Sequence, residues 1–153
     1  MPGCGKTTIG KILSKKMDKS FYDTDEEIEK KYSRSPEKII TSDGEAAFRI
    51  IESEAAAELG KKNSAIIATG GGIILDPANI NSLRQNGTIV YIDRDLSLLE
   101  TAGRPLSSGD LNELYKKRAP LYEKHADIIV KNDMDPESSA EGIIARLTDI
   151  DLF

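Results

Sequence analysis

The sequence has little of what several classes of protein require. It contains one cysteine, Cys4, among 153 residues, which excludes an intramolecular disulfide and a cysteine-rich metal site. Apolar runs stay well short of the roughly 20 residues that a membrane-spanning helix needs. The first residues also lack the apolar core of a secretory signal. The sequence therefore predicts a protein of the reducing cytoplasm with no membrane partner.

Positive charge is not in excess. Charged residues make up 31% of the chain and the formal net charge is -5, so general electrostatic attraction to nucleic acid is not expected. Any phosphate that the protein binds must be held by a local cluster of donors. A chain of 153 residues has room for one domain and no second catalytic domain.

The chain opens on a glycine-rich segment, residues 1–8 (MPGCGKTT). Gly5, Lys6 and Thr7 match the second half of the P-loop pattern G-x-x-x-x-G-K-[ST]. In that pattern loop amides cradle phosphate, the lysine reaches the β- and γ-phosphates, and the hydroxyl binds Mg²⁺. The first glycine of the pattern falls before Met1. An ordinary glycine turn ahead of a lysine-rich helix is the alternative interpretation.

The rest of the chain alternates between two kinds of segment. Short apolar segments predict strands at residues 20–23, 65–68, 88–92 and 127–130. Apolar periodicity predicts helices over 6–17, 24–33, 43–61, 77–85, 110–125 and 136–148. This alternation is typical of an α/β protein with a parallel sheet. The glycine- and proline-containing segment at about 102–110 is a candidate mobile lid.

Two acidic residues, Asp23 and Asp25, end the first predicted strand. The carboxyl ends of strands are where α/β sheets bind ligands. One carboxylate can support a magnesium ion, and the other can accept a proton from an attacking hydroxyl group. A helix start, with Thr24 or Asp25 as its N-cap, explains the same residues equally well.

Three glycines, Gly70 to Gly72, follow the apolar strand at 65–68. Such a run indicates close approach of the backbone to a ligand, or positive φ, whereas a plain strand-to-helix turn usually needs one glycine. Three arginines, Arg49, Arg104 and Arg118, offer guanidinium forks that suit a carboxylate or a phosphate. Taken singly, each arginine also reads as a solvated surface charge.

Taken in order, these motifs resemble those of shikimate kinases, in the nucleoside-monophosphate-kinase branch of P-loop proteins. The matching segments are residues 3–7 (GCGKT), 23–25 (DTD), 43–52 (DGEAAFRIIE), 70–72 (GGG), 104–106 (RPL) and 118–122 (RAPLY). The shared order of six spaced motifs makes the resemblance specific. It implies transfer of the ATP γ-phosphoryl group to the 3-hydroxyl of shikimate, on the route to chorismate and the aromatic amino acids.

The resemblance also implies a fold and a set of site residues. The fold is a three-layer P-loop kinase in which helices flank a parallel sheet, here one N-terminally truncated domain over residues 1–153 without the central first strand. The implied catalytic residues are Asp25 as the base, Lys6 and Arg104. The implied shikimate-binding residues are Asp25, Arg49, Glu52, Gly70, Gly71, Gly72 and Arg118. The implied ATP-binding residues are Gly3, Cys4, Gly5, Lys6, Thr7, Thr8 and Arg104, and the implied Mg²⁺ ligands are Thr7 and Asp23.

The sequence departs from the family pattern in three places. The missing first strand predicts a gap of roughly 10 Å, two strand spacings, between its neighbours in the sheet. Residues 99–104 form a shorter lid without an additional upstream arginine, and residues 132–136 provide no basic residue in the adenine loop. These last two departures predict weaker nucleotide binding and leave the reaction unchanged.

Two other functions fit the same residues. One is a kinase for another small hydroxylated acid, such as gluconate, and the other is an inactive nucleotide-binding module. We also expect the present start of the chain to be artificial, and the protein to act as a monomer.

Overall fold

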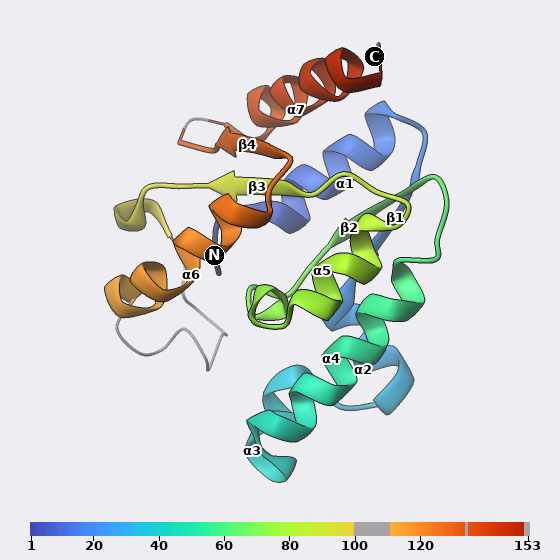
Figure 1. Cartoon of the computed structure of the whole chain (residues 1–153), viewed down its shortest axis with the longest axis vertical. Coiled ribbons are helices and arrows are strands. Elements are labelled where there is room, and N and C mark those ends of the chain that lie inside the picture. Colours follow the sequence, from blue (N-terminus) through green and yellow to red (C-terminus); the bar gives the residue numbers. More distant parts are fainter. Residues whose placement is uncertain (100–110, 134, 152–153) are drawn as a thin grey trace.

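The computed structural model describes residues 1–99, 111–133 and 135–151 (Figure 1). Short strands alternate with helices along these residues, and η1 and η2 are single turns of 3₁₀ helix. The elements are α1 (Lys6–Lys16), β1 (Ser20–Asp23), α2 (Thr24–Tyr32), α3 (Pro36–Asp43), α4 (Glu45–Leu59), β2 (Ala65–Ala68), η1 (Ile73–Leu75), α5 (Pro77–Arg84), β3 (Val90–Asp93), η2 (Leu96–Leu98), α6 (Leu111–His125), β4 (Ile128–Lys131) and α7 (Pro136–Asp151).

The predicted strands at 20–23 and 65–68 are confirmed, whereas β3 and β4 both lie slightly later than predicted. The prediction of one helix over 43–61 is wrong at its start. Gly44 has φ +89°, and this residue separates α4 from an unpredicted helix, α3. Ser35 caps α3 by accepting a hydrogen bond from the Lys38 amide, and Pro36 occupies its first turn. A serine followed by proline is therefore the signal that the prediction overlooked.

The strands form two parallel pairs. β1 pairs with β2, with Phe21 opposite Ile66, and β3 pairs with β4, with Tyr91 opposite Ile129. In the described part of the chain, β2 and β3 do not pair with each other, so there are two sheets of two strands each. The described strands thus form two separate parallel pairs and not one continuous sheet.

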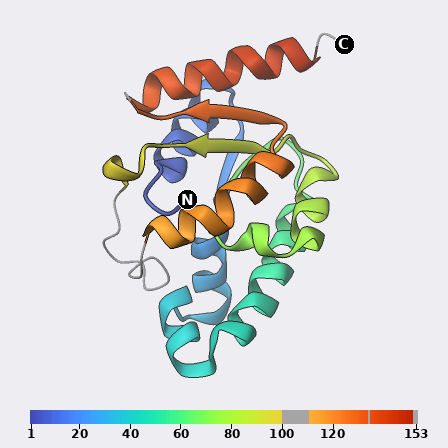
Figure 2. The ribbon, with the colours of Figure 1, turned by 60° about the vertical axis from the view of Figure 1, so that its left-hand side comes forward.

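Helices cover both faces of the strands (Figures 1 and 2). On one face, α1 and α7 pack together through a core that includes Ile9, Leu13 and Ile143. On the other face, a second core joins α4, η1 and α5. A third cluster ties α2, α3 and α4 together at the end of the molecule opposite α7. None of the helices in the described ranges combines the length and apolar character that crossing a bilayer needs.

Candidate active site

The phosphate loop leads directly into a helix. Gly3 and Gly5 have φ values of +71° and +92°, which side chains disfavour and glycine adopts without strain. Gly5 is the N-cap of α1, and Lys6 is the first residue of that helix. Helix N-termini direct unpaired amides and the positive end of the helix dipole at an anion. The geometry therefore favours the phosphate-binding interpretation over an ordinary glycine turn.

Asn132 supports this loop from the end of β4. The residue is 2% exposed, and its Nδ2 donates a hydrogen bond of 2.8 Å to the carbonyl oxygen of Cys4. Ser139 donates to Oδ1 of Asn132 at 3.1 Å, which orients the amide. A Cβ atom on Gly5 would lie 2.5 Å from Nδ2, so only glycine leaves room for this support. Asn132 was not among the predicted site residues, although a polar residue directly after an apolar strand could have suggested it.

Arg94 is a second residue that the sequence analysis did not single out. It follows β3, and its Nη1 donates to the carbonyl oxygen of Gly3 at 3.3 Å. Its Nε is buried and finds no hydrogen-bond acceptor among the described residues. The positively charged side chain of Arg94 therefore contacts the phosphate loop from the side of β3. No motif in the sequence indicates this contact.

Thr7 and Asp23 meet beside the loop. The Thr7 hydroxyl donates to Oδ2 of Asp23 at 3.0 Å, and the Asp23 residue is 8% exposed. Oδ1 of Asp23 accepts from the Asp25 amide at 3.0 Å, which makes Asp23 the N-cap of α2. The capping interpretation thus holds for Asp23, and not for Thr24 or Asp25 as the sequence suggested. The Asp23 carboxylate can cap α2 and also bond to Thr7, because each of its oxygens has a different partner.

The donor types at this point suit Mg²⁺. A hydroxyl and a carboxylate oxygen are ligands that Mg²⁺ accepts, and this ion usually takes few protein ligands beside phosphates and water. In keeping with that, the described residues contain no cluster of three or more His, Cys, Asp or Glu side chains.

The backbone of the glycine run, Gly70 to Gly72, forms the floor of the site. Charged side chains approach this floor closely. A Cβ atom on Gly70 would lie 3.0 Å from Oδ1 of Asp25 and 3.0 Å from Oε1 of Glu52. On Gly71 it would lie 3.4 Å from Nη1 of Arg118. The run does not have positive φ, so close approach is the explanation that the structure supports.

Gly72 faces a fourth charged group, the guanidinium of Arg49. A Cβ atom there would overlap that guanidinium. Nη1 of Arg49 lies 2.6 Å from Oε2 of Glu52, and Nη2 lies 2.8 Å from Oε1 of Glu45. Both bonds run along α4, since the partners are three and four residues apart. Burial raises the pKa of Glu52, and the hydrogen bond from Arg49 opposes that rise without cancelling it.

Arg118 and Tyr122 reach the same floor from α6. Arg118 is 6% exposed, so it is not the solvated surface charge of the alternative interpretation. The Tyr122 hydroxyl donates to the carbonyl oxygen of Gly71 at 2.5 Å, and its ring stacks on Tyr91 with centroids 5.0 Å apart. Burial raises the pKa of Tyr122 to about 12, so the phenol stays neutral and remains a donor. Tyr122 belongs to a motif quoted above, but its role as a support was not predicted.

The structure thus brings together most of the predicted residues. Asp25, Glu52, Arg49 and Arg118 surround the glycine run, and the electrostatic influence of Asp25 and Arg118 reaches the Glu52 carboxyl. Thr8 is exposed in the first turn of α1. Arg104 and the candidate lid at 102–110 lie outside the described residues.

Comparison with known proteins places this geometry in a family. A model of the shikimate kinase family matches residues 2–148. A shikimate kinase of Clostridium botulinum (strain Alaska E43 / Type E3) is 40% identical over 140 residues, covering 87% of this chain and 84% of that protein. A shikimate kinase of Aquifex aeolicus is 35% identical over 151 residues, covering 94% of this chain and 89% of that protein.

Solved structures give the same result. Shikimate kinase from Acinetobacter baumannii in complex with shikimate has a TM-score of 0.93 and 32% identity, covering 99% of this chain and 92% of that one. The Aquifex aeolicus enzyme has a TM-score of 0.85 and 32% identity, covering 98% of this chain and 94% of that one. These likenesses confirm the predicted α/β fold of the P-loop kinase class.

Proposed function

The chain belongs to the shikimate kinase family, and we propose that it transfers the γ-phosphoryl group of ATP to the 3-hydroxyl group of shikimate. The observation that carries this proposal is the gathering of Asp25, Glu52, Arg49 and Arg118 around one glycine run. An acceptor with a carboxylate and several hydroxyl groups needs cations for the first and hydrogen-bonding carboxylates for the second. The family belongs to the biosynthesis of aromatic amino acids.

Arg49 and Arg118 bind the acceptor carboxylate in this proposal. Guanidinium groups hold a carboxylate through paired hydrogen bonds, and partial burial strengthens them. Glu52 fixes Arg49 by a bond of 2.6 Å, so the arginine does not have to be ordered when the acceptor arrives. Tyr122 holds the Gly71 carbonyl and thereby the floor on which the acceptor lies.

Asp25 is the proposed base. It lies in the first turn of α2 and approaches Gly70 from the same side as Glu52. There it can bind acceptor hydroxyls and take the proton from the hydroxyl that attacks the phosphorus. Lys6, at the N-terminus of α1, supplies fixed positive charge where negative charge develops on the transferred group. Arg104 has the same role in the proposal.

Thr7 and Asp23 would hold Mg²⁺, Thr7 through its hydroxyl and Asp23 through a bound water. The ion, when bound with ATP, neutralises charge on the β- and γ-phosphates. Asn132 and Arg94 keep the loop in shape through the Cys4 and Gly3 carbonyls, so the loop amides remain directed at phosphate. We further propose that the enzyme acts as a cytoplasmic monomer.

The test is a coupled assay of ADP release with a panel of acceptors. We expect turnover with shikimate and Mg-ATP, and none with gluconate or without an acceptor. Turnover with gluconate alone would replace the acceptor in this proposal. Binding of ATP without ADP production at saturating shikimate would identify an inactive nucleotide-binding module. Sedimentation of the same sample checks the monomer.

A further inference from the structure

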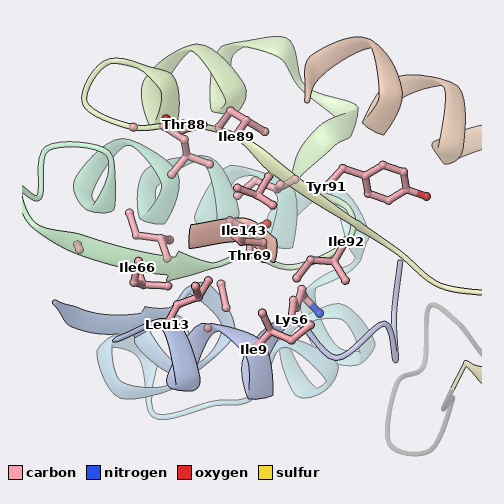
Figure 3. Close-up of a pocket in the computed structure, with 18 of the residues that line it drawn as sticks. Lys6, Ile9, Leu13, Ile66, Thr69, Thr88, Ile89, Tyr91, Ile92 and Ile143 are labelled. Carbon is pink, nitrogen blue, oxygen red and sulfur yellow. The ribbon is translucent and has the colours of Figure 1, made fainter. Parts of the chain in front are cut away.

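Tyr91 is a buried tyrosine of β3 that the proposed function does not use. The residue is 6% exposed, and Figure 3 shows its side chain extending away from Ile9 and Leu13 of α1. Its hydroxyl donates to Oδ1 of Asp93 at 3.0 Å. Burial and then this hydrogen bond raise the pKa of Tyr91, so the phenol stays neutral and remains a donor. The Tyr91 hydroxyl is therefore tied to its own strand.

Asp93 is a fixed acceptor because its backbone is held at the end of β3. Its carbonyl oxygen accepts from the Asn132 amide at 2.8 Å, directly after β4. The next residue, Arg94, donates to the carbonyl oxygen of Gly3 at 3.3 Å. The position of Tyr91 is thus set by β3, β4 and the phosphate loop together.

Tyr91 meets α6 at two places. Its ring stacks on that of Tyr122, with centroids 5.0 Å apart and 22° between the ring planes. Burial and the nearby Asp93 carboxylate raise the pKa of Tyr115, and a hydrogen bond with Tyr91 opposes that rise. Tyr115 and Tyr122 are seven residues apart in the sequence, so they lie on the same side of the helix.

Arg118 also lies on this side of α6, three residues after Tyr115 and four before Tyr122. A Cβ atom on Gly71 would lie 3.4 Å from Nη1 of Arg118. The Tyr122 hydroxyl donates to the carbonyl oxygen of Gly71 at 2.5 Å. The side of the helix that contacts Tyr91 is therefore the side that reaches the glycine run.

α6 depends on such contacts because Pro120 lies inside the helix. Proline has no backbone N–H, so Pro120 cannot donate to the carbonyl oxygen of Lys116, one turn earlier. Arg118 lies between these two residues. The turn that carries Arg118 thus lacks one backbone hydrogen bond, and side-chain contacts decide more of its orientation.

We propose that Tyr91 is a positioning residue for the acceptor. Held by Asp93, it fixes α6 in the orientation that brings Arg118 and Tyr122 to the glycine run. It acts through Tyr122 and does not have to touch the acceptor. This inference rests on the proposed function, in which Arg118 binds the acceptor carboxylate. Loss of Tyr91 then weakens acceptor binding, whereas Asp25, which belongs to α2, keeps its place.

Steady-state kinetics of Tyr91→Leu and Tyr91→Phe test this role. We expect Tyr91→Leu to raise the shikimate KM about tenfold, because the stacked ring is lost. Tyr91→Phe keeps the ring and loses only the bond to Asp93, so the rise should be about threefold. For both variants kcat and the ATP KM should stay within about twofold. A fall in kcat at unchanged shikimate KM would overturn the proposal.

Phe21→Leu is the matched control for loss of a strand aromatic. Phe21 belongs to β1, and a Cβ atom on Gly10 of α1 would lie 2.7 Å from its Cε2. The control should lower Tm and leave both KM values unchanged. An equal rise of the shikimate KM in Phe21→Leu and Tyr91→Leu would show a general loss of stability and contradict the positioning role.

A double-mutant cycle shows whether Tyr91 acts through Tyr122. Tyr122→Leu removes the ring on which Tyr91 stacks. In that background Tyr91→Leu should raise the shikimate KM by less than about threefold, because the partner is already absent. A full tenfold rise in both backgrounds would show independent effects and overturn the proposal.

NMR without substrate provides a readout that is separate from kinase activity. The nitrogen shift of the Gly72 amide reports the hydrogen bond to the Gly71 carbonyl, because both groups belong to one peptide unit. We expect Tyr91→Leu to move this signal in the same direction as Tyr122→Phe, and Phe21→Leu to leave it in place. An unmoved signal in Tyr91→Leu would contradict the positioning role.

Tyr91→Phe decides the question if Tyr91→Leu does not fold, since a smaller shift of the Gly72 signal in the same direction is expected. An unmoved signal in Tyr91→Phe would then overturn the proposal. The expected shifts in a protein that shows no turnover with shikimate would contradict the proposed function and still support the positioning of α6 by Tyr91.

Discussion

Nη1 of Arg49 lies 2.6 Å from Oε2 of Glu52, and the Glu52 side chain is 1% exposed. The arginine itself is more accessible, with a side-chain exposure of 22%. The Arg49 guanidinium is therefore available to the site, while the Glu52 carboxylate stays buried. We expect Glu52→Gln to raise the shikimate KM by about 10- to 100-fold, because a charge-assisted bond that orients Arg49 is lost. The KM for ATP should stay within about twofold. Steady-state kinetics with each substrate varied measures both, and an unchanged shikimate KM would contradict this positioning role.

The same pair predicts a pH dependence. Burial raises the pKa of Glu52 above its usual value, so its carboxylate is lost at a higher pH than that of an exposed glutamate. As the pH falls through this raised pKa, the shikimate KM of the wild type should rise. The KM of Glu52→Gln, which has no carboxyl group to titrate, should not show this step. The KM profiles of the two proteins between pH 4.5 and neutrality provide the measurement.

Gly72→Ala tests the close approach of Arg49 to the glycine run. The added Cβ would overlap the guanidinium, so Arg49 must move and the shikimate KM should rise by about tenfold or more. Gly142→Ala is the matched control, because Gly142 lies inside α7 and a Cβ atom there would meet nothing within 4 Å. That control should leave the kinetics unchanged and stabilise the protein by about 0.5–1 kcal/mol. Equal kinetics for both variants would show that Gly72 is not needed for space.

Asp25→Asn separates catalysis from binding. If Asp25 is the base, turnover should fall by about 10²- to 10⁴-fold, while the affinity for ATP changes little. Single-turnover kinetics measures the first quantity, and equilibrium binding of ATP measures the second. Turnover equal to that of the wild type would remove Asp25 as the base.

Arg118→Ala should act chiefly on the acceptor. Arg118 is buried at the glycine floor, and loss of a charge-assisted bond to the shikimate carboxylate costs about 1.5–3 kcal/mol. The shikimate KM should therefore rise by roughly one to two orders of magnitude, with a smaller change in kcat. Arg84→Ala is the control, since Arg84 forms a partly exposed pair with Asp127 and bonds the His125 carbonyl, away from the glycine run. A comparable KM for both variants would argue against the carboxylate contact.

The buried amino terminus predicts a pH-dependent stability. Its pKa in the folded chain lies below the unfolded value of 8.0, so the unfolded state binds more protons between these two values. The free energy of unfolding should therefore rise as the pH increases from the lowered pKa to 8.0. This group lowers the stability progressively as the pH falls from 8.0 towards the lowered pKa, and causes no further change below it. Acetylation of Met1 should abolish this slope, and urea titrations of both forms across the range test it. Parallel profiles would contradict the burial of the terminus.

Local sequence determined much of the chemistry of this protein. Gly5, Lys6 and Thr7 specify a loop with a helix behind it, because glycine permits the positive φ and the apolar spacing that follows is helical. The strands at 20–23 and 65–68 could be predicted because short apolar segments bounded by glycine or polar residues adopt few structures other than a strand. Order along the chain was enough to identify the family.

Tertiary structure decided how these parts support one another. Asn132 and Arg94 bond to the loop from more than ninety residues away in the chain, and no local pattern encodes a contact across that distance. Spacing also could not reveal that each glycine of the run faces a different side chain, since this depends on where α2, α4 and α6 pack. Which strands flank the interruption, β2 and β3, is visible only in the fold, because strand pairing joins segments that are remote in sequence.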